Sequence, residues 1–150
     1  MTNNILIICM GNLCRSPTAE AVLRAKATAL GIEVNIDSAG LLEFHQGALP
    51  DPRSQAAGEK RGYSFQGIKA RQVVEKDFES FDLILSTDQE NLSGLFKLCP
   101  KPHQHKLRLF LSFGSSGYDD IPDPYYGGHD VFELVLDLIE DASESLLRSL

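Results

Sequence analysis

The chain lacks the features that mark several common protein classes. Its 150 residues include only three cysteines, an odd and small number that does not suit a disulfide-stapled secreted domain. No apolar run reaches the roughly 20 residues of a membrane span, and residues 1–4 lack the layout of a signal peptide. Positive charge is scarce, since 14 Lys and Arg face 21 Asp and Glu. We therefore expect a cytoplasmic protein that binds neither membranes nor nucleic acids.

The spacing of possible metal ligands also argues against a metal site. Cys9 and Cys14 lie five residues apart, and His103 and His105 fall in a stretch rich in Lys, Pro and Gln. These spacings do not match those of structural zinc sites. We expect no metal and no cofactor.

Apolar residues alternate between strand-like and helix-like patterns along the whole chain. A length of 150 residues with 43% apolar content suits one domain, residues 1–150. Strands are predicted at 4–9, 32–38, 81–87 and 107–111, and helices at 16–30, 51–61, 88–98 and 131–146. Ser16 is expected to cap the first helix, with Pro17 in its first position. This order predicts a single-domain, doubly wound α/β sandwich: a parallel sheet of about four strands with helices on both faces.

The segment from Cys9 to Pro17 places a thiol at a strand end, where ligands bind in such sheets. Gly11 and Asn12 tolerate positive φ, so the backbone N–H groups can turn inward and form a cradle for an anion. Arg15 adds a planar fork that matches two phosphate oxygens, and the helix N-terminus adds further positive charge. This setting favours the thiolate form of Cys9, and a thiolate beneath a bound phosphate is a nucleophile aimed at phosphorus.

Residues 9–20 (CMGNLCRSPTAE) resemble the signature of the low-molecular-weight protein tyrosine phosphatases. Residues 37–40, 50–53, 70–72, 77–82 and 123–125 resemble further segments of the family, in the same order. The resemblance implies hydrolysis of phosphotyrosine and aryl phosphates through a phosphocysteine on Cys9. Arg15 would hold the phosphoryl oxygens together with the loop residues Met10, Gly11, Asn12, Leu13 and Cys14. Phosphate or sulfate is then the expected anion in this loop.

A general acid is expected in the loop at residues 114–128, which is rich in Gly, Ser, Asp and Pro. The residues alone do not distinguish Asp119, Asp120 and Asp123, since aspartates are common turn formers. The resemblance selects Asp123, which would protonate the departing phenolate and then deprotonate the attacking water. Because Cys9 must be ionised while Asp123 is protonated, we expect a mildly acidic pH optimum.

Residues around the loop are expected to support it. The resemblance implies that Ser16 donates a hydrogen bond to the Cys9 sulfur, and that Ser38 supports Asn12 from a second layer. Members of the family often carry a histidine that supports this asparagine, at a position that is Ile68 here. We therefore expect Asn12 to find another partner.

Three aromatic residues are candidates for the walls of the substrate cleft. Phe44, Tyr125 and Tyr126 would stack on a flat aryl ring and select it over a serine phosphate, although paired tyrosines also occur in ordinary surface packing. A tyrosine-phosphorylated protein is the expected substrate and partner. For a bacterial source, the resemblance would add a tyrosine kinase as a second partner.

Two other functions compete with this interpretation. A thiol-dependent arsenate reductase would need two further cysteines to relay a disulfide, and only Cys99 lies outside the loop. A non-catalytic phosphotyrosine-binding module is disfavoured by the presence of Cys9, Arg15 and Asp123 together. Cys14 is either a reversible disulfide partner for Cys9 or a small core thiol.

Overall fold

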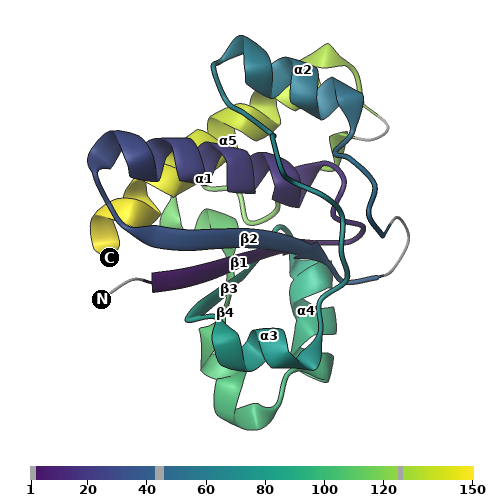
Figure 1. Cartoon of the computed structure of the whole chain (residues 1–150), viewed down its shortest axis with the longest axis vertical. Coiled ribbons are helices and arrows are strands. Elements are labelled where there is room, and N and C mark those ends of the chain that lie inside the picture. The colour runs from purple at the N-terminus through teal and green to yellow at the C-terminus, as the bar shows by residue number, and fades with distance from the viewer. Residues whose placement is uncertain (1–2, 43–45, 125–126) are drawn as a thin grey trace.

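The strand β1 (Asn3–Cys9) lies at the centre of the molecule, with β2 (Val34–Gly40) on one side and β3 (Leu83–Ser86) on the other (Figure 1). The computed structural model describes residues 3–42, 46–124 and 127–150. All strand pairs are parallel, in the order β2-β1-β3-β4, where β4 is Leu107–Leu109. The α-helices are α1 (Arg15–Leu30), α2 (Pro52–Lys60), α3 (Glu75–Ser80), α4 (Gln89–Leu98) and α5 (His129–Ser149).

Side chains of β1 alternate between two hydrophobic cores. Ile5 and Ile7 pack in the cluster formed by α1 and α5, whereas Leu6 and Ile8 pack in the cluster that contains residues of α3 and α4. All four side chains are completely buried, which explains the continuous apolar run in the sequence. Helices cover both faces of the sheet, as Figure 1 shows, and the predicted fold class is confirmed.

Several elements differ from those expected, including the 3-10 helix η1 (Lys101–Lys106), which was not predicted, and β2, which was expected at 32–38. The last strand ends at Leu109 rather than residue 111, because Phe110 and Leu111 form a 3-10 turn, η2 (Phe110–Phe113). Both side chains are buried in the same cluster, and a strand would have sent them to opposite faces. The helix α3 was not predicted, since six residues are too few to show helical periodicity.

The carboxyl ends of β1, β2 and β3 meet at one edge of the sheet. Cys9 pairs in register with Gly40, and Ile8 pairs with Ser86 on the other side. The predicted loop at residues 114–128 reaches the same edge, since the Ile121 N–H donates to Thr87 O at 2.8 Å. Residues from four separate parts of the chain therefore converge at the edge where Cys9 lies. Across the described ranges, no helix is both long and apolar enough to cross a membrane.

Candidate active site

Cys9 is the last residue of β1, and the chain curls around its sulfur before α1 begins. The Asn12 N–H donates to Cys9 Sγ at 3.2 Å, and Ser16 Oγ lies 2.9 Å from the same sulfur. Asn12 makes this curl possible by adopting a φ of 58°, in the left-handed region that asparagine tolerates better than most residues. The thiol is 3% exposed, so two hydrogen-bonding groups face it in a largely enclosed setting.

The loop also lies close against β2. A Cβ atom on Gly40 would lie 3.0 Å from the Gly11 carbonyl carbon and 3.1 Å from Met10 O, so only glycine allows this approach. The Met10 carbonyl accepts the Leu42 N–H at 3.0 Å, and the Leu13 carbonyl accepts the Asp51 N–H at 2.9 Å. The loop is thus held from both sides by main-chain hydrogen bonds.

Ser16 does not cap α1, and that prediction is wrong. The helix begins at Arg15, so Pro17 is its third residue and not its first as predicted, and the N-cap residue, Cys14, makes no side-chain capping bond. The Ser16 hydroxyl lies instead between Cys9 Sγ and Asn12 Nδ2, at 2.9 and 2.8 Å. The hydroxyl therefore accepts from the buried amide and bonds the sulfur, and it makes no capping bond to the helix.

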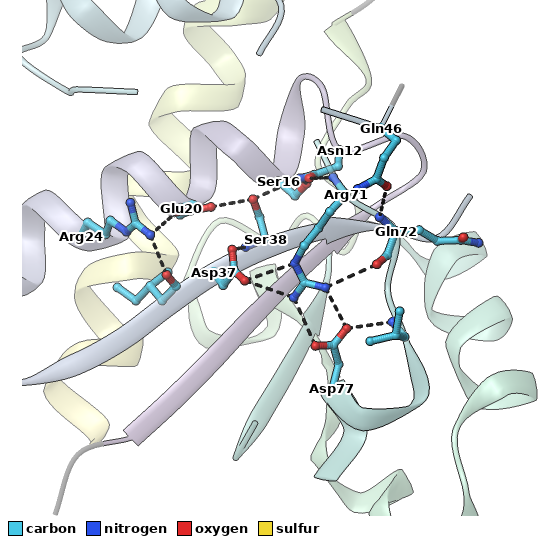
Figure 2. Close-up of polar contacts among 12 residues, drawn as sticks. Asn12, Ser16, Glu20, Arg24, Asp37, Ser38, Gln46, Arg71, Gln72 and Asp77 are labelled. Carbon is cyan, nitrogen blue, oxygen red and sulfur yellow. Dashed lines mark hydrogen bonds and ion pairs between the residues drawn. The ribbon is translucent and has the colours of Figure 1, made fainter. Parts of the chain in front are cut away.

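Asn12 joins the loop to β2 and to a more distant segment (Figure 2). Its Nδ2 donates to Ser16 Oγ at 2.8 Å and to Ser38 Oγ at 3.0 Å. Its Oδ1 accepts the main-chain N–H of Arg71 at 3.1 Å. Asn12 therefore has another partner, as expected, while Ile68 is buried in an apolar cluster with Ala21 and Phe65.

Glu20 extends this network into α1, and no sequence argument singled it out. Its Oε1 accepts the Ser38 hydroxyl at 2.6 Å, and its Oε2 pairs with Arg24. The side chain is 2% exposed. Burial raises the pKa of Glu20, although the Ser38 hydrogen bond and the Arg24 charge oppose the change.

Glu20→Gln should change how stability depends on pH. Because the folded pKa is raised, the folded chain binds more protons than the unfolded chain in the window just above the ordinary carboxyl pKa. The wild-type free energy of unfolding therefore falls as pH rises through that window, and the variant lacks this loss. Urea unfolding at about pH 4 and at about pH 7 measures the difference. Parallel pH dependence of the two proteins would contradict the assignment.

Arg15 is held behind the loop by Asp88, the residue at which the sequence predicted only the start of a helix. Arg15 Nη1 donates to Asp88 Oδ2 at 2.7 Å and to Ile121 O at 3.1 Å. Asp88 does cap α4, since its Oδ1 accepts the Asn91 N–H at 2.7 Å. An aspartate before a helix is fully explained as a cap, so the sequence did not indicate that Asp88 also binds Arg15.

The negative groups around Arg15 stabilise its positively charged form. Burial lowers the pKa of Arg15, but attraction to the Cys9 sulfur and to Asp88 outweighs burial and raises it overall. Asp123 faces the same guanidinium, with Oδ2 4.0 Å from Nη2, and its side chain is 51% exposed. An anion bound over Cys9 would therefore meet a fixed arginine, with an accessible carboxyl group beyond it.

The two cysteines of the loop have different surroundings. Burial, together with the negative charge of Asp51, raises the pKa of Cys14 to about 12. Cys14 is thus a thiol at neutral pH and is poorly suited to act as a nucleophile. Cys9, Cys14 and Cys99 are all free and buried.

The structure gathers most of the predicted site residues at one place. Met10, Gly11, Asn12, Leu13 and Cys14 form the loop that follows Cys9, and Ser16 contacts the Cys9 sulfur. Ser38 contacts Asn12, and Asp123 faces Arg15. Phe44, Tyr125 and Tyr126 lie outside the described residues. Among the residues that are described, no group of three or more His, Cys, Asp or Glu side chains could hold a metal ion.

A parallel α/β domain that brings a cysteine, an arginine and an aspartate together at its strand ends has the make-up of a cysteine-dependent phosphatase. The sequence matches the family model described as low molecular weight phosphotyrosine protein phosphatase over residues 4–150. The chain belongs to this family of enzymes.

Individual relatives agree with this assignment. The low molecular weight protein-tyrosine-phosphatase YfkJ of Bacillus subtilis is 41% identical over 150 residues, which cover 98% of this chain and 95% of that protein. The human low molecular weight phosphotyrosine protein phosphatase is 38% identical over 138 residues, 89% of this chain and 87% of that one. A crystal structure of protein tyrosine phosphatase from Entamoeba histolytica has a TM-score of 0.94 at 37% identity, covering 98% and 96% of the two chains.

Proposed function

We propose that this chain hydrolyses phosphotyrosine and other aryl phosphate monoesters through a phosphocysteine on Cys9. One observation carries the proposal: Cys9 Sγ lies within hydrogen-bond distance of both the Asn12 N–H and the Ser16 hydroxyl, beside a buried arginine. Such surroundings stabilise a negative sulfur and attract a phosphate dianion.

In the proposed first step, the Cys9 sulfur attacks phosphorus, and the bond between phosphorus and the phenolic oxygen breaks. Arg15 and the N–H groups of residues 10–14 hold the other three phosphoryl oxygens. Asp123 gives its proton to the departing phenolate, so that a neutral phenol leaves. Asp88 keeps the Arg15 guanidinium in place, because its 2.7 Å bond fixes one of the two terminal nitrogens.

In the second step, water attacks the phosphorus of phosphocysteine and the P–S bond breaks. Asp123 takes a proton from the water, and inorganic phosphate leaves. Its 51% exposed side chain is accessible both to the leaving group and to the incoming water. The Ser16 hydroxyl stabilises the Cys9 sulfur as it becomes a leaving group.

The expected ligands follow from the same chemistry. Phosphate or sulfate should occupy the loop, and the Entamoeba histolytica relative is described with Hepes in its active site. A tyrosine-phosphorylated protein is the proposed substrate, while a tyrosine kinase partner, a cytoplasmic location and an aryl-selective wall of Phe44, Tyr125 and Tyr126 stay predictions.

Rapid-quench trapping tests the mechanism. Wild-type protein mixed with phosphorus-labelled p-nitrophenyl phosphate and denatured within milliseconds should carry label on the peptide that contains Cys9. Asp123→Asn should carry more label at steady state. Phosphocysteine still forms, because p-nitrophenolate leaves without an acid, but its hydrolysis is slowed because the attacking water needs a base. Loss of general base catalysis slows that step by about 10²- to 10⁴-fold.

Each failure of this experiment has its own meaning. Label on another peptide would move the nucleophile away from Cys9. Absence of label, together with arsenate-dependent oxidation of thiols, would favour an arsenate reductase. Phenyl phosphate, which has a poor leaving group, should be hydrolysed far more slowly by Asp123→Asn than by wild type, and equal rates would reassign the acid.

A further inference from the structure

We propose that Arg71 is a positioning residue for the phosphate-binding loop: Asp37 and Asp77 hold its side chain, and its main-chain N–H sets the orientation of Asn12. The inference rests on the proposed role of Cys9 as nucleophile. Arg71 lies 59 residues from Asn12 in the chain and contacts the loop through its main-chain N–H.

The guanidinium of Arg71 is held from two sides (Figure 2). From β2, Asp37 Oδ2 accepts bonds from Nε and Nη2 at 3.2 and 3.1 Å. From α3, Asp77 accepts from Nη1 and Nη2 at 2.9 and 3.2 Å. Asp77 Oδ2 also accepts the Val74 N–H at 2.8 Å, which fixes it at the start of α3. All three guanidinium nitrogens are therefore tied to elements of the fold.

The backbone around Arg71 runs along the end of β2 as an added parallel bridge. Gly40 N–H donates to Arg71 O at 2.7 Å, and Val73 N–H donates to Gly40 O at 2.9 Å. Gly40 is the residue that pairs in register with Cys9. The clamp on the Arg71 side chain thus fixes a backbone segment one strand away from the nucleophile.

The contact of the Arg71 N–H with Asn12 determines which groups donate and which accept in the hydrogen bonds between Asn12, Ser16 and Ser38. A main-chain N–H can only donate, so it must face the amide oxygen of Asn12. The Asn12 NH₂ group then faces Ser16 and Ser38, and both hydroxyl oxygens must accept from it. Each hydroxyl keeps its own proton to donate elsewhere. Ser38 donates to the Glu20 carboxylate, and the Ser16 proton is available for the Cys9 sulfur, which lies 2.9 Å from Ser16 Oγ and accepts this proton when it is a thiolate.

Arg71 therefore acts on Cys9 through Asn12 and Ser16. If Asn12 were free to turn its amide over, the oxygen would face the two hydroxyls and draw their protons away from their present acceptors. Ser16 would then no longer donate to the sulfur, and the thiolate would lose a charge-assisted hydrogen bond. Ile68 cannot take over, because its buried side chain has no polar atom.

The test is the pH at which Cys9 becomes half-reactive toward iodoacetate, measured together with kcat. Arg71→Ala should raise this midpoint by about one pH unit, as expected for losing a hydrogen bond to a charged group. Arg71→Lys keeps the charge but cannot bond both carboxylates in the same way. Its midpoint should therefore lie between those of the wild type and Arg71→Ala. Arg15 and Cys14, which also face Cys9, are unchanged in both variants.

Arg61→Ala is the matched control. The Arg61 side chain is 25% exposed against 26% for Arg71, and it also binds several carboxylates, those of Glu133, Asp137 and Glu140. None of these residues belongs to the loop or its network. This control should lower the melting temperature and leave the alkylation midpoint unchanged. A merely structural role for Arg71 would give the same result as the control.

A double-mutant cycle separates action through Asn12 from a general effect. Asn12→Ala combined with Arg71→Ala should have the same midpoint and kcat as Asn12→Ala alone, because Arg71 can act on Cys9 only while the Asn12 side chain is present to be oriented. Additive effects, or an unchanged midpoint in Arg71→Ala, would overturn the inference. If Arg71→Ala does not fold, Arg71→Lys decides by the same measures. A wild-type thiol that reacts only at alkaline pH would overturn the proposed function itself.

Discussion

Cys9→Ser should reduce turnover of p-nitrophenyl phosphate by more than about 10⁴-fold and leave phosphate binding intact. The hydroxyl of serine is a far weaker nucleophile than a thiolate, and burial raises the pKa of both other thiols, Cys14 and Cys99. Arg15, the loop N–H groups and Ser16 all remain, so the anion cradle is unchanged. Removing the negative sulfur also removes its repulsion of a phosphate dianion. Steady-state kinetics and calorimetric titration with phosphate measure the two effects.

Cys99→Ser is the control for this substitution. Cys99 is 5% exposed, and burial raises its pKa, so it is an unreactive thiol at the end of α4. We expect the same kcat and KM as in the wild type. A Cys9→Ser protein that still turned over substrate would show that the reaction does not pass through phosphocysteine.

Arg15→Ala should lose both turnover and anion binding. Arginines that bind a transferring phosphoryl group contribute about 10³- to 10⁵-fold to kcat. Here the loss should extend to ground-state binding, because this buried guanidinium adjoins the sulfur. The substitution also leaves the Asp88 carboxylate without its partner, and that negative charge would repel phosphate. The measurements are kcat/KM and phosphate affinity.

Arg15→Lys separates charge from shape. A lysine keeps one positive charge but lacks the planar fork, so it should restore part of the anion binding and little of the turnover. Arg108→Ala, on the short strand β4, is the control for removal of an arginine elsewhere. Wild-type phosphate affinity in Arg15→Ala would show that the loop N–H groups suffice, and would contradict the proposed site.

The sequence predicted the fold class because its main signals are local. The buried run in β1, the Gly31 stop of α1 with its φ of 69°, and the apolar face of α5 each depend on neighbouring residues. The errors also have local causes. Ser16 and Pro17 match a helix start, and Ser16 is diverted from capping only by the sulfur and amide that the fold places beside it.

The candidate loop around Cys9 was predicted for the same reason. Cys9, Gly11, Asn12 and Arg15 lie within seven consecutive positions, so their chemistry can be recognised without knowing any distant contact. The roles of Asp88 and Arg71 could not be recognised in this way. Asp88 bonds Arg15 from 73 positions away, and Arg71 bonds Asn12 from 59 positions away.

By itself, the sequence determined the order of the strands and longer helices, the candidate nucleophile with its loop, and the family resemblance, because each is encoded in contiguous residues. Only the tertiary structure decided which groups hold the loop in place: Asp88 behind Arg15, and the Asp37–Arg71–Asp77 clamp behind Asn12. The physical reason is that parallel strands bring their carboxyl ends to one edge, so residues far apart in the chain become neighbours there. Hydrogen bonds depend on distance in space, and the distance between two residues in space cannot be read from their separation along the chain.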